Sequence, residues 1–257
     1  MDVGGMTLQF DGMLVPVELG SLSRRAKLTI ERDGSLQLKA APDVERSELE
    51  RFLASKRDWI YRKLAEKEAF AAEPVTKELV GGEGYLYLGR SYQLRIVDTE
   101  DNRVRLERGK LVLPRQLADA GYDHLIDWYC TTGLTWLKPR AKDWANRLKV
   151  EPRTIEVADL GTKWGSALPN GRVRVHWATM QLRPALVEYV LAHELAHLHE
   201  PHHGPTFWQL LGRVLPDFDE RKTQLAHVGG SLWTGSHTAV KPAQYRFAAR
   251  RGGASEH

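Results

Sequence analysis

Five of the ten histidines of this chain lie within one stretch of eleven residues, from His193 to His203. The stretch opens with the pattern H-E-x-x-H, in which His193, Glu194 and His197 hold the defined positions. Residues four apart on an α-helix project from the same face, one turn above the other. Two imidazoles placed in this way can bind one metal ion, with the carboxylate of Glu194 beside them. A zinc hydrolase needs this set together with a third ligand and a metal-bound water.

The residues before the motif favour a metal site over a chance match on a solvated helix. Apolar residues follow Pro184 at helical spacing, namely Leu186, Val187, Val190 and Leu191, and they predict a mostly buried helix. Two histidines and a glutamate on such a helix cost free energy unless a partner satisfies them. Pro201 is expected to stop the helix one turn past His197.

The third ligand must come from the residues that follow the motif. His199 lies about 200° round the helix from His197 and points away. Glu200 is on the correct face, but it lies roughly 10.5 Å along the axis from His193, too far for both to reach one ion. The candidates inside the helix are therefore unsuitable.

The turn beyond the helix offers two further histidines, His202 and His203. His203 lies six residues after His197, the spacing of the H-E-x-x-H-x-x-G-x-x-H pattern, and Gly204 would ease the return of the chain towards the metal. We predict that His193, His197 and His203 bind the metal, with His202 as the alternative third ligand.

Several segments together resemble one known family. His193–Trp208 (HELAHLHEPHHGPTFW) looks like the active-site signature of the YgjP-like metallopeptidases, relatives of the SprT-like zincins. Lys163–Ser166 resembles that family's R/K-W-G-S-C segment, although Ala167 replaces the cysteine, and His176 stands near a position that is often asparagine. Gly89–Leu94 and the region from Leu28 to Ile60 extend the likeness to about nine-tenths of the chain. The resemblance implies zinc-dependent hydrolysis.

These residues predict a zinc metallopeptidase with one Zn²⁺ per chain. Three neutral imidazoles would leave a fourth position for water, whose pKa the metal lowers towards neutrality. Glu194 would accept its proton as general base and return it to the leaving amine of a peptide or protein substrate. The residue that stabilises the oxyanion stays open between His227, Tyr189 and the loop at Lys163.

Three other functions remain open. The same metal-bound hydroxide could hydrolyse a nucleotide or another phosphate substrate. A protease associated with DNA, as in SprT-like relatives, could use the basic outer face of the helix expected over residues 116–148, where Lys138, Arg140, Lys142 and Arg147 could contact phosphate. A structural zinc is the weakest alternative, because structural sites use four protein ligands and often cysteine.

Composition places few limits on these functions. The 257 residues are 42% hydrophobic and 27% charged, and the net charge of +4 permits an acidic partner such as nucleic acid without requiring one. The single cysteine, Cys130, excludes an internal disulfide and suits a reducing compartment. Neither a signal peptide nor a membrane-spanning run is recognisable, so we expect a cytoplasmic protein that does not enter a membrane. Nothing in the sequence indicates the oligomeric state.

The predicted fold class is α+β, in three parts. Residues 1–113 should form a small β-rich α+β unit, with an edge strand over 14–19, a hairpin over 27–39 and a helix with a capping box from Ser47. Residues 114–229 should form a zincin-like catalytic domain, in which strand 172–177 would be the edge strand that binds substrate. Residues 230–257 should be a flexible basic tail.

Overall fold

The computed structural model describes residues 6–20, 25–31, 35–68 and 75–237. Its mixture of helix and sheet agrees with the predicted α+β class. The buried apolar side chains form two separate cores, one within residues 8–60 and the other within residues 85–233. The cores therefore divide in the segment before β5 (Val75–Lys77) rather than near the predicted boundary at residue 113.

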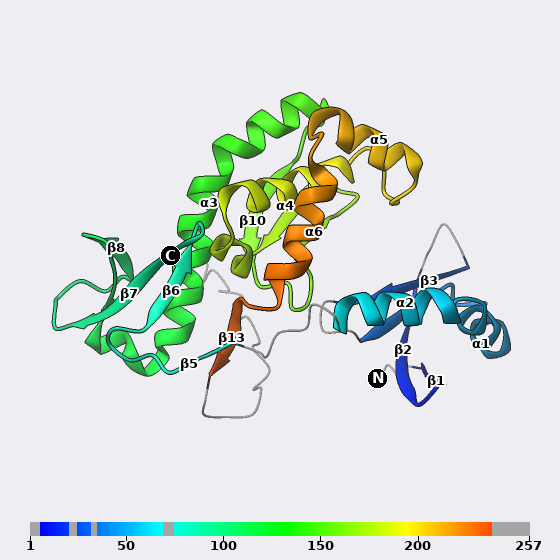
Figure 1. The fold of residues 1–257 in the computed structure, drawn as a ribbon, viewed down its shortest axis with the longest axis horizontal. Helices are drawn as coiled ribbons and strands as arrows, with labels where there is room; N and C mark the ends of the chain where they lie inside the picture. Colours follow the sequence, from blue (N-terminus) through cyan, green and yellow to red (C-terminus); the bar gives the residue numbers. More distant parts are fainter. Residues whose placement is uncertain (1–5, 21–24, 32–34, 69–74, 238–257) are drawn as a thin grey trace, which may run out of the picture.

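The N-terminal unit is a four-stranded sheet covered by two helices (Figure 1). The strands β1 (Met6–Phe10), β2 (Met13–Leu19), β3 (Ala26–Ile30) and β4 (Leu36–Ala40) have the order β1-β2-β4-β3. The helices are α1 (Arg46–Ser55) and α2 (Arg57–Glu68). Apolar residues of both the strands and the helices are buried between the sheet and the helices, including Leu8 in β1, Leu38 in β4 and Leu53 in α1.

Two predictions for this unit were wrong and one was right. β2 is an inner strand, not an edge strand, because it pairs with β1 on one side and with β4 on the other. The proline at position 16 is tolerated because β4 pairs only with Val17–Leu19, after it. Ser47 does not open a capping box, since α1 begins at Arg46 with Glu45 as its N-cap. The β3–β4 hairpin is antiparallel, as predicted, while its turn at 32–34 lies outside the described residues.

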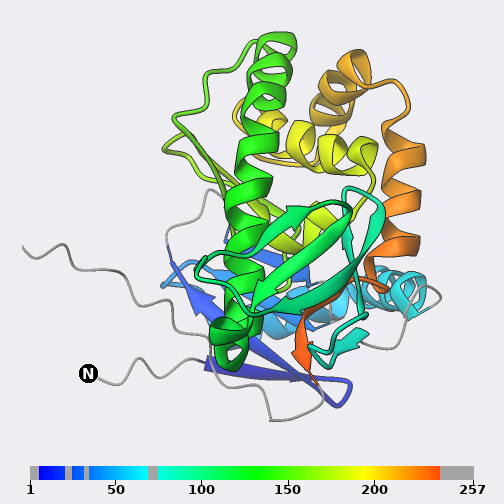
Figure 2. The same ribbon diagram turned by 90° about the vertical axis from the view of Figure 1, so that its left-hand side faces the viewer.

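The larger unit is built around one long helix, α3 (Gly121–Leu148), which follows the 3-10 helix η1 (Arg115–Ala120). In Figure 2, α3 runs along this unit with a four-stranded sheet across one end. That sheet, ordered β6-β7-β9-β8, consists of β6 (Gly84–Tyr87), β7 (Arg90–Val97), β8 (Arg105–Glu107) and β9 (Lys110–Pro114). Its buried residues, such as Leu111 and Leu113, share one core with α3.

The start of the predicted tail is a strand. β13 (Trp233–His237) pairs in parallel with β5, and the Trp233 side chain is buried against Tyr85 and Trp177. The prediction of a flexible tail was therefore wrong for these residues, because one large aromatic ring anchors the segment. Residues 238–257 lie outside the described part of the chain.

A three-stranded sheet and three helices complete the larger unit. The strands β10 (Thr154–Ala158), β11 (Gly165–Ala167) and β12 (Arg172–His176) have the order β10-β12-β11. The 3-10 helix η2 (Trp177–Gln181) leads into α4 (Pro184–Ala196), which is followed by α5 (Pro205–Val214) and α6 (Phe218–Gly229). Among the described residues, no helix is both long and apolar enough to cross a membrane.

Candidate metal centre

Helix α4 presents the H-E-x-x-H residues from the middle of the larger core. Pro184 is its first residue, and the helix buries nine of its side chains, including Leu191 and Leu195, as the apolar pattern predicted. It ends at Ala196, earlier than the predicted stop at Pro201. His197 caps the helix in αR conformation (φ −65°, ψ −16°), so it keeps the helical alignment with His193.

The chain then turns back so that His203 faces the end of the helix. The amide N–H of Gly204 donates to the carbonyl of His202 (2.7 Å), and α5 begins directly afterwards at Pro205. Gly204 has φ −80° and ψ 179°, an extended conformation open to any residue, and a Cβ added there would have no other atom within 4 Å, its chain neighbours aside. The expectation that Gly204 eases the return finds no support in these angles, because another residue could adopt them.

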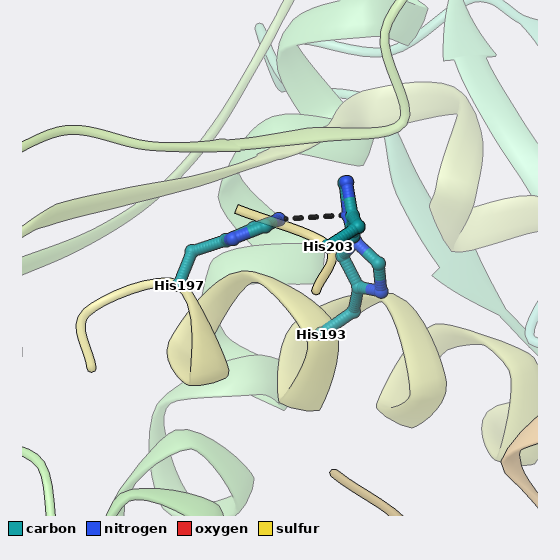
Figure 3. Close-up of side chains that lie close together, drawn as sticks. All are labelled: His193, His197 and His203. Carbon is teal, nitrogen blue, oxygen red and sulfur yellow. Dashed lines mark hydrogen bonds between the residues drawn. The ribbon is translucent and has the colours of Figure 1, made fainter. Parts of the chain in front are cut away.

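Three Nε2 atoms converge at this turn (Figure 3). The Nε2 of His203 lies 2.8 Å from that of His193 and 3.1 Å from that of His197. Nitrogen ligands of a tetrahedral zinc ion, with Zn–N bonds of ~2.0–2.1 Å, are on the order of 3.3 Å apart. The three side chains therefore fit one divalent ion. Among the described residues, His202 stands outside this cluster.

Neighbouring groups fix the orientation of the rings. The Nδ1–H of His197 donates to the backbone carbonyl of Glu200 (2.9 Å), which leaves Nε2 free to bind a metal. The buried Phe207 ring lies 4.6–4.9 Å from all three imidazoles, and Trp208 stacks on His203 at 5.5 Å. These two aromatic residues therefore pack against the candidate ligands, a contact that the sequence analysis did not predict.

The surroundings keep the imidazoles neutral. Burial lowers the pKa of His193 well below its ordinary value, and it also lowers the pKa of His197. Burial, with the charge of the neighbouring histidine, lowers the pKa of His203 to about 4. A neutral ring is the form that binds a metal, so the site is ready to coordinate at neutral pH.

Glu194 is enclosed beside the ligands, with only 8% of its surface exposed. Burial raises the pKa of its carboxyl group to about 8, against the opposing effects of the Ala167 amide, which donates to the carboxylate, and of the Lys163 ammonium. Gly165 makes room for this side chain, since a Cβ there would lie 2.5 Å from Glu194 Cγ. Strand β11 thus holds the carboxyl group in place.

The same strand forms the sheet edge beside α4. Strand β12, which was predicted to be this edge, lies between β10 and β11, so that prediction was wrong. The loop before β11 is anchored by Trp164, whose ring packs on Gly229 of α6 and whose carbonyl accepts from the His176 amide (2.8 Å). The K-W-G-S segment therefore brings the outer edge of β11 beside the three imidazoles; no other described strand pairs with this edge, and its Ala167 amide bonds to Glu194.

Other residues considered in the sequence analysis have partners within the fold. Tyr189 is buried at 5.9 Å from the His193 ring, and burial raises the pKa of its hydroxyl, so it stays protonated at neutral pH. The ring of His199 points away from the site and bonds to the Leu148 carbonyl (3.0 Å). On the basic face of α3, Arg140 lies over the Trp136 ring at 3.6 Å.

The N-terminal unit reaches the loop that precedes β11. The hydroxyl of Thr162 donates to the carboxylate of Glu31, which directly follows β3, at 2.7 Å. The sequence gave no indication of this contact, because 131 residues separate the two side chains. It places the edge strand of the N-terminal sheet near the metal centre.

Comparison with known proteins identifies the family. The YgjP-like metallopeptidase domain matches residues 24–228. The chain belongs to the YgjP-like metallopeptidase family. No curated protein sequence matches this YgjP-like chain. A solved structure, the metallopeptidase zymogen of Pyrococcus abyssi abylysin, shares 20% sequence identity with it, covers 35% of this chain and 90% of its own, and has a TM-score of 0.33.

Proposed function

We propose that this YgjP-like protein is a zinc-dependent metallopeptidase of zincin type, with His193, His197 and His203 as the ligands of one Zn²⁺ and Glu194 as general base. The proposal rests on the convergence of three Nε2 atoms beside a buried carboxyl group. When bound, zinc would act as a Lewis acid and lower the pKa of a bound water.

The protein's own residues supply the other steps. Glu194 takes a proton on its carboxylate and passes it to the leaving amine. The outer edge of β11, apart from the Ala167 amide that bonds to Glu194, pairs with an extended peptide, main chain to main chain, which aligns the scissile bond with the metal centre. The Ala167 amide keeps the Glu194 carboxylate oriented during this exchange.

Zinc analysis combined with a Glu194→Gln variant tests the proposal. We expect the variant to retain one zinc per chain and to lose peptide cleavage, whereas Glu220→Gln, an exposed position on α6, keeps both. Retained cleavage in Glu194→Gln would remove this residue from the mechanism. Release of phosphate or pyrophosphate from nucleotides, lost in His193→Ala, would instead favour the phosphate hydrolase.

Weak association with nucleic acid is a separate possibility that we retain as a prediction. Arg140 also pairs with Glu188 (3.3 Å), and Arg147 lies over the Trp144 ring at 4.7 Å, so part of the basic face is already engaged within the protein. Binding that weakens steeply with salt would support this role, and binding indifferent to salt would oppose it.

A further inference from the structure

Three exposed lysines from three different elements surround the metal centre. Lys222, on α6, lies with its ammonium 4.7 Å from the centroid of the Trp208 ring, which in turn stacks on His203. Its charge helps to lower the pKa of both His193 and His203. Lys222 therefore sits beside the ligands on the α6 side.

Lys27 approaches the same centre from the N-terminal unit. Alternate residues of a strand share a face, so Lys27 and Glu31 project to the same side of β3, away from the core that includes Leu38. Glu31 contacts Thr162 on this side. Lys27 lies at the opposite end of β3 from Glu31, and its positive charge helps to lower the pKa of His197 and of His203.

Lys163 is the third lysine, and it is exposed directly before Trp164 and the edge strand β11. Its charge reaches Glu194. Two negatively charged carboxylates lie in the same region: Glu31, which accepts the Thr162 hydrogen bond, and Asp219, whose charge acts on the buried Tyr189. The three lysines are the cations whose charge acts on the imidazoles and on Glu194, so positive charge approaches the candidate metal centre from three elements.

We propose that the site around the candidate metal centre selects acidic peptide segments, in which aspartate or glutamate side chains near the scissile bond pair with Lys27, Lys163 and Lys222. This inference rests on the proposed peptidase function. A peptide paired with β11 would lie next to Lys163, which precedes the strand by two residues, and its side chains would extend towards Lys222 over Trp208 and towards Lys27 on β3. Charge complementarity of this kind governs specificity and association rate.

The expected effect of each lysine is modest. An exposed ion pair changes affinity about two- to fivefold, and salt screens it over a Debye length of ~8 Å at physiological ionic strength. Together the three lysines should favour an acidic peptide over an isosteric amide peptide by about tenfold, and the preference should shrink at high salt.

Binding separates this inference from catalysis. The probes are fluorescent decapeptides with a central Ala-Leu pair flanked by glutamates or by glutamines, and a single-stranded oligonucleotide of equal charge. Affinities are measured for zinc-loaded Glu194→Gln protein by anisotropy, at 50 and 300 mM salt. Lys27→Gln, Lys163→Gln and Lys222→Gln are each added to this background, with Lys142→Gln on the exposed face of α3 as control.

We expect the glutamate peptide to bind about tenfold more tightly, and each of the three substitutions, but not Lys142→Gln, to weaken it about two- to fivefold. Equal affinity for the glutamate and glutamine peptides, or an equal effect of Lys142→Gln, would overturn the inference. Tighter binding of the oligonucleotide through the same lysines would also overturn it. Because binding needs no turnover, a catalytically inactive wild-type protein would refute the proposed function alone.

Discussion

Replacing Gly165 with alanine should misplace the general base without disturbing the metal ligands. The new Cβ would lie 2.5 Å from Glu194 Cγ and 2.8 Å from both Cδ and Oε1, whereas ordinary contacts are 3.4–4 Å. Gly165 does not require a positive φ, so the clash with Glu194 is the main consequence. The Glu194 side chain is enclosed and must shift by about 1 Å.

A catalytic group misplaced by about 1 Å costs on the order of 10²-fold in rate, equivalent to about 2.7 kcal/mol of transition-state stabilisation. We therefore expect kcat for peptide cleavage to fall about 100-fold in Gly165→Ala. Zinc content should remain at the wild-type value, because the three imidazoles come from α4 and the turn after it.

The assay combines steady-state kinetics, elemental analysis and the thermal unfolding midpoint. Gly204→Ala is the matched control, since Gly204 adjoins His203 but nothing lies within 4 Å of the added Cβ. Gly204→Ala should leave kcat within about twofold of the wild-type value, because a change at this N-cap position costs only about 1 kcal/mol or less of stability. Wild-type kcat in a folded, zinc-loaded Gly165→Ala protein would refute the role of β11 in positioning Glu194.

Three further predictions concern ligands, packing and charge. His203→Ala should lose zinc by elemental analysis, whereas His202→Ala should retain it; the reverse result would exchange their roles. Phe207→Ala should lower the free energy of unfolding by about 3–5 kcal/mol in urea titrations, since its ring is fully buried under the imidazoles. The hydrogen bond from His176 lowers the pKa of Asp159 from 3.8 to about 2, so this carboxylate stabilises the fold above pH 3.8 and the effect is lost as pH falls towards 2. Asp159→Asn should cost about 1 kcal/mol at pH 7, reduced because the side chain is partly exposed, and the difference from wild type should narrow at pH 3.

The sequence correctly predicted those features of the fold that depend only on residues close together in the chain. The i, i+4 spacing of His193 and His197 depends only on helical periodicity, and the run after Pro184 predicted the burial of α4. The β3–β4 hairpin has the same local origin in alternating side chains. These features need no knowledge of distant parts of the chain.

Pairing between distant segments was not predictable in the same way. The position of β12 inside its sheet depends on its parallel partner β10 and on the short β11, whose Gly-Ser-Ala sequence lacks the apolar alternation of a strand. The burial of Trp233 depends on β5, which lies far away in the sequence. The position of Lys222 over the Trp208 ring and the effect of the Lys27 charge on the pKa of His197 likewise arise from tertiary packing.

The position of β11 connects two requirements of a peptidase. One side of this strand pairs with β12, and its outer edge is where we propose that an extended peptide binds. Its Ala167 amide bonds to the Glu194 carboxylate, and the absence of a Cβ at Gly165 leaves room for that side chain. Substitutions in β11 should therefore change kcat, because they move the base, whereas Lys27 and Lys222 lie outside this contact and should act on KM. Kinetics of Gly165→Ala and Lys222→Gln on one acidic peptide test the distinction. An effect of Lys222→Gln on kcat alone would contradict it.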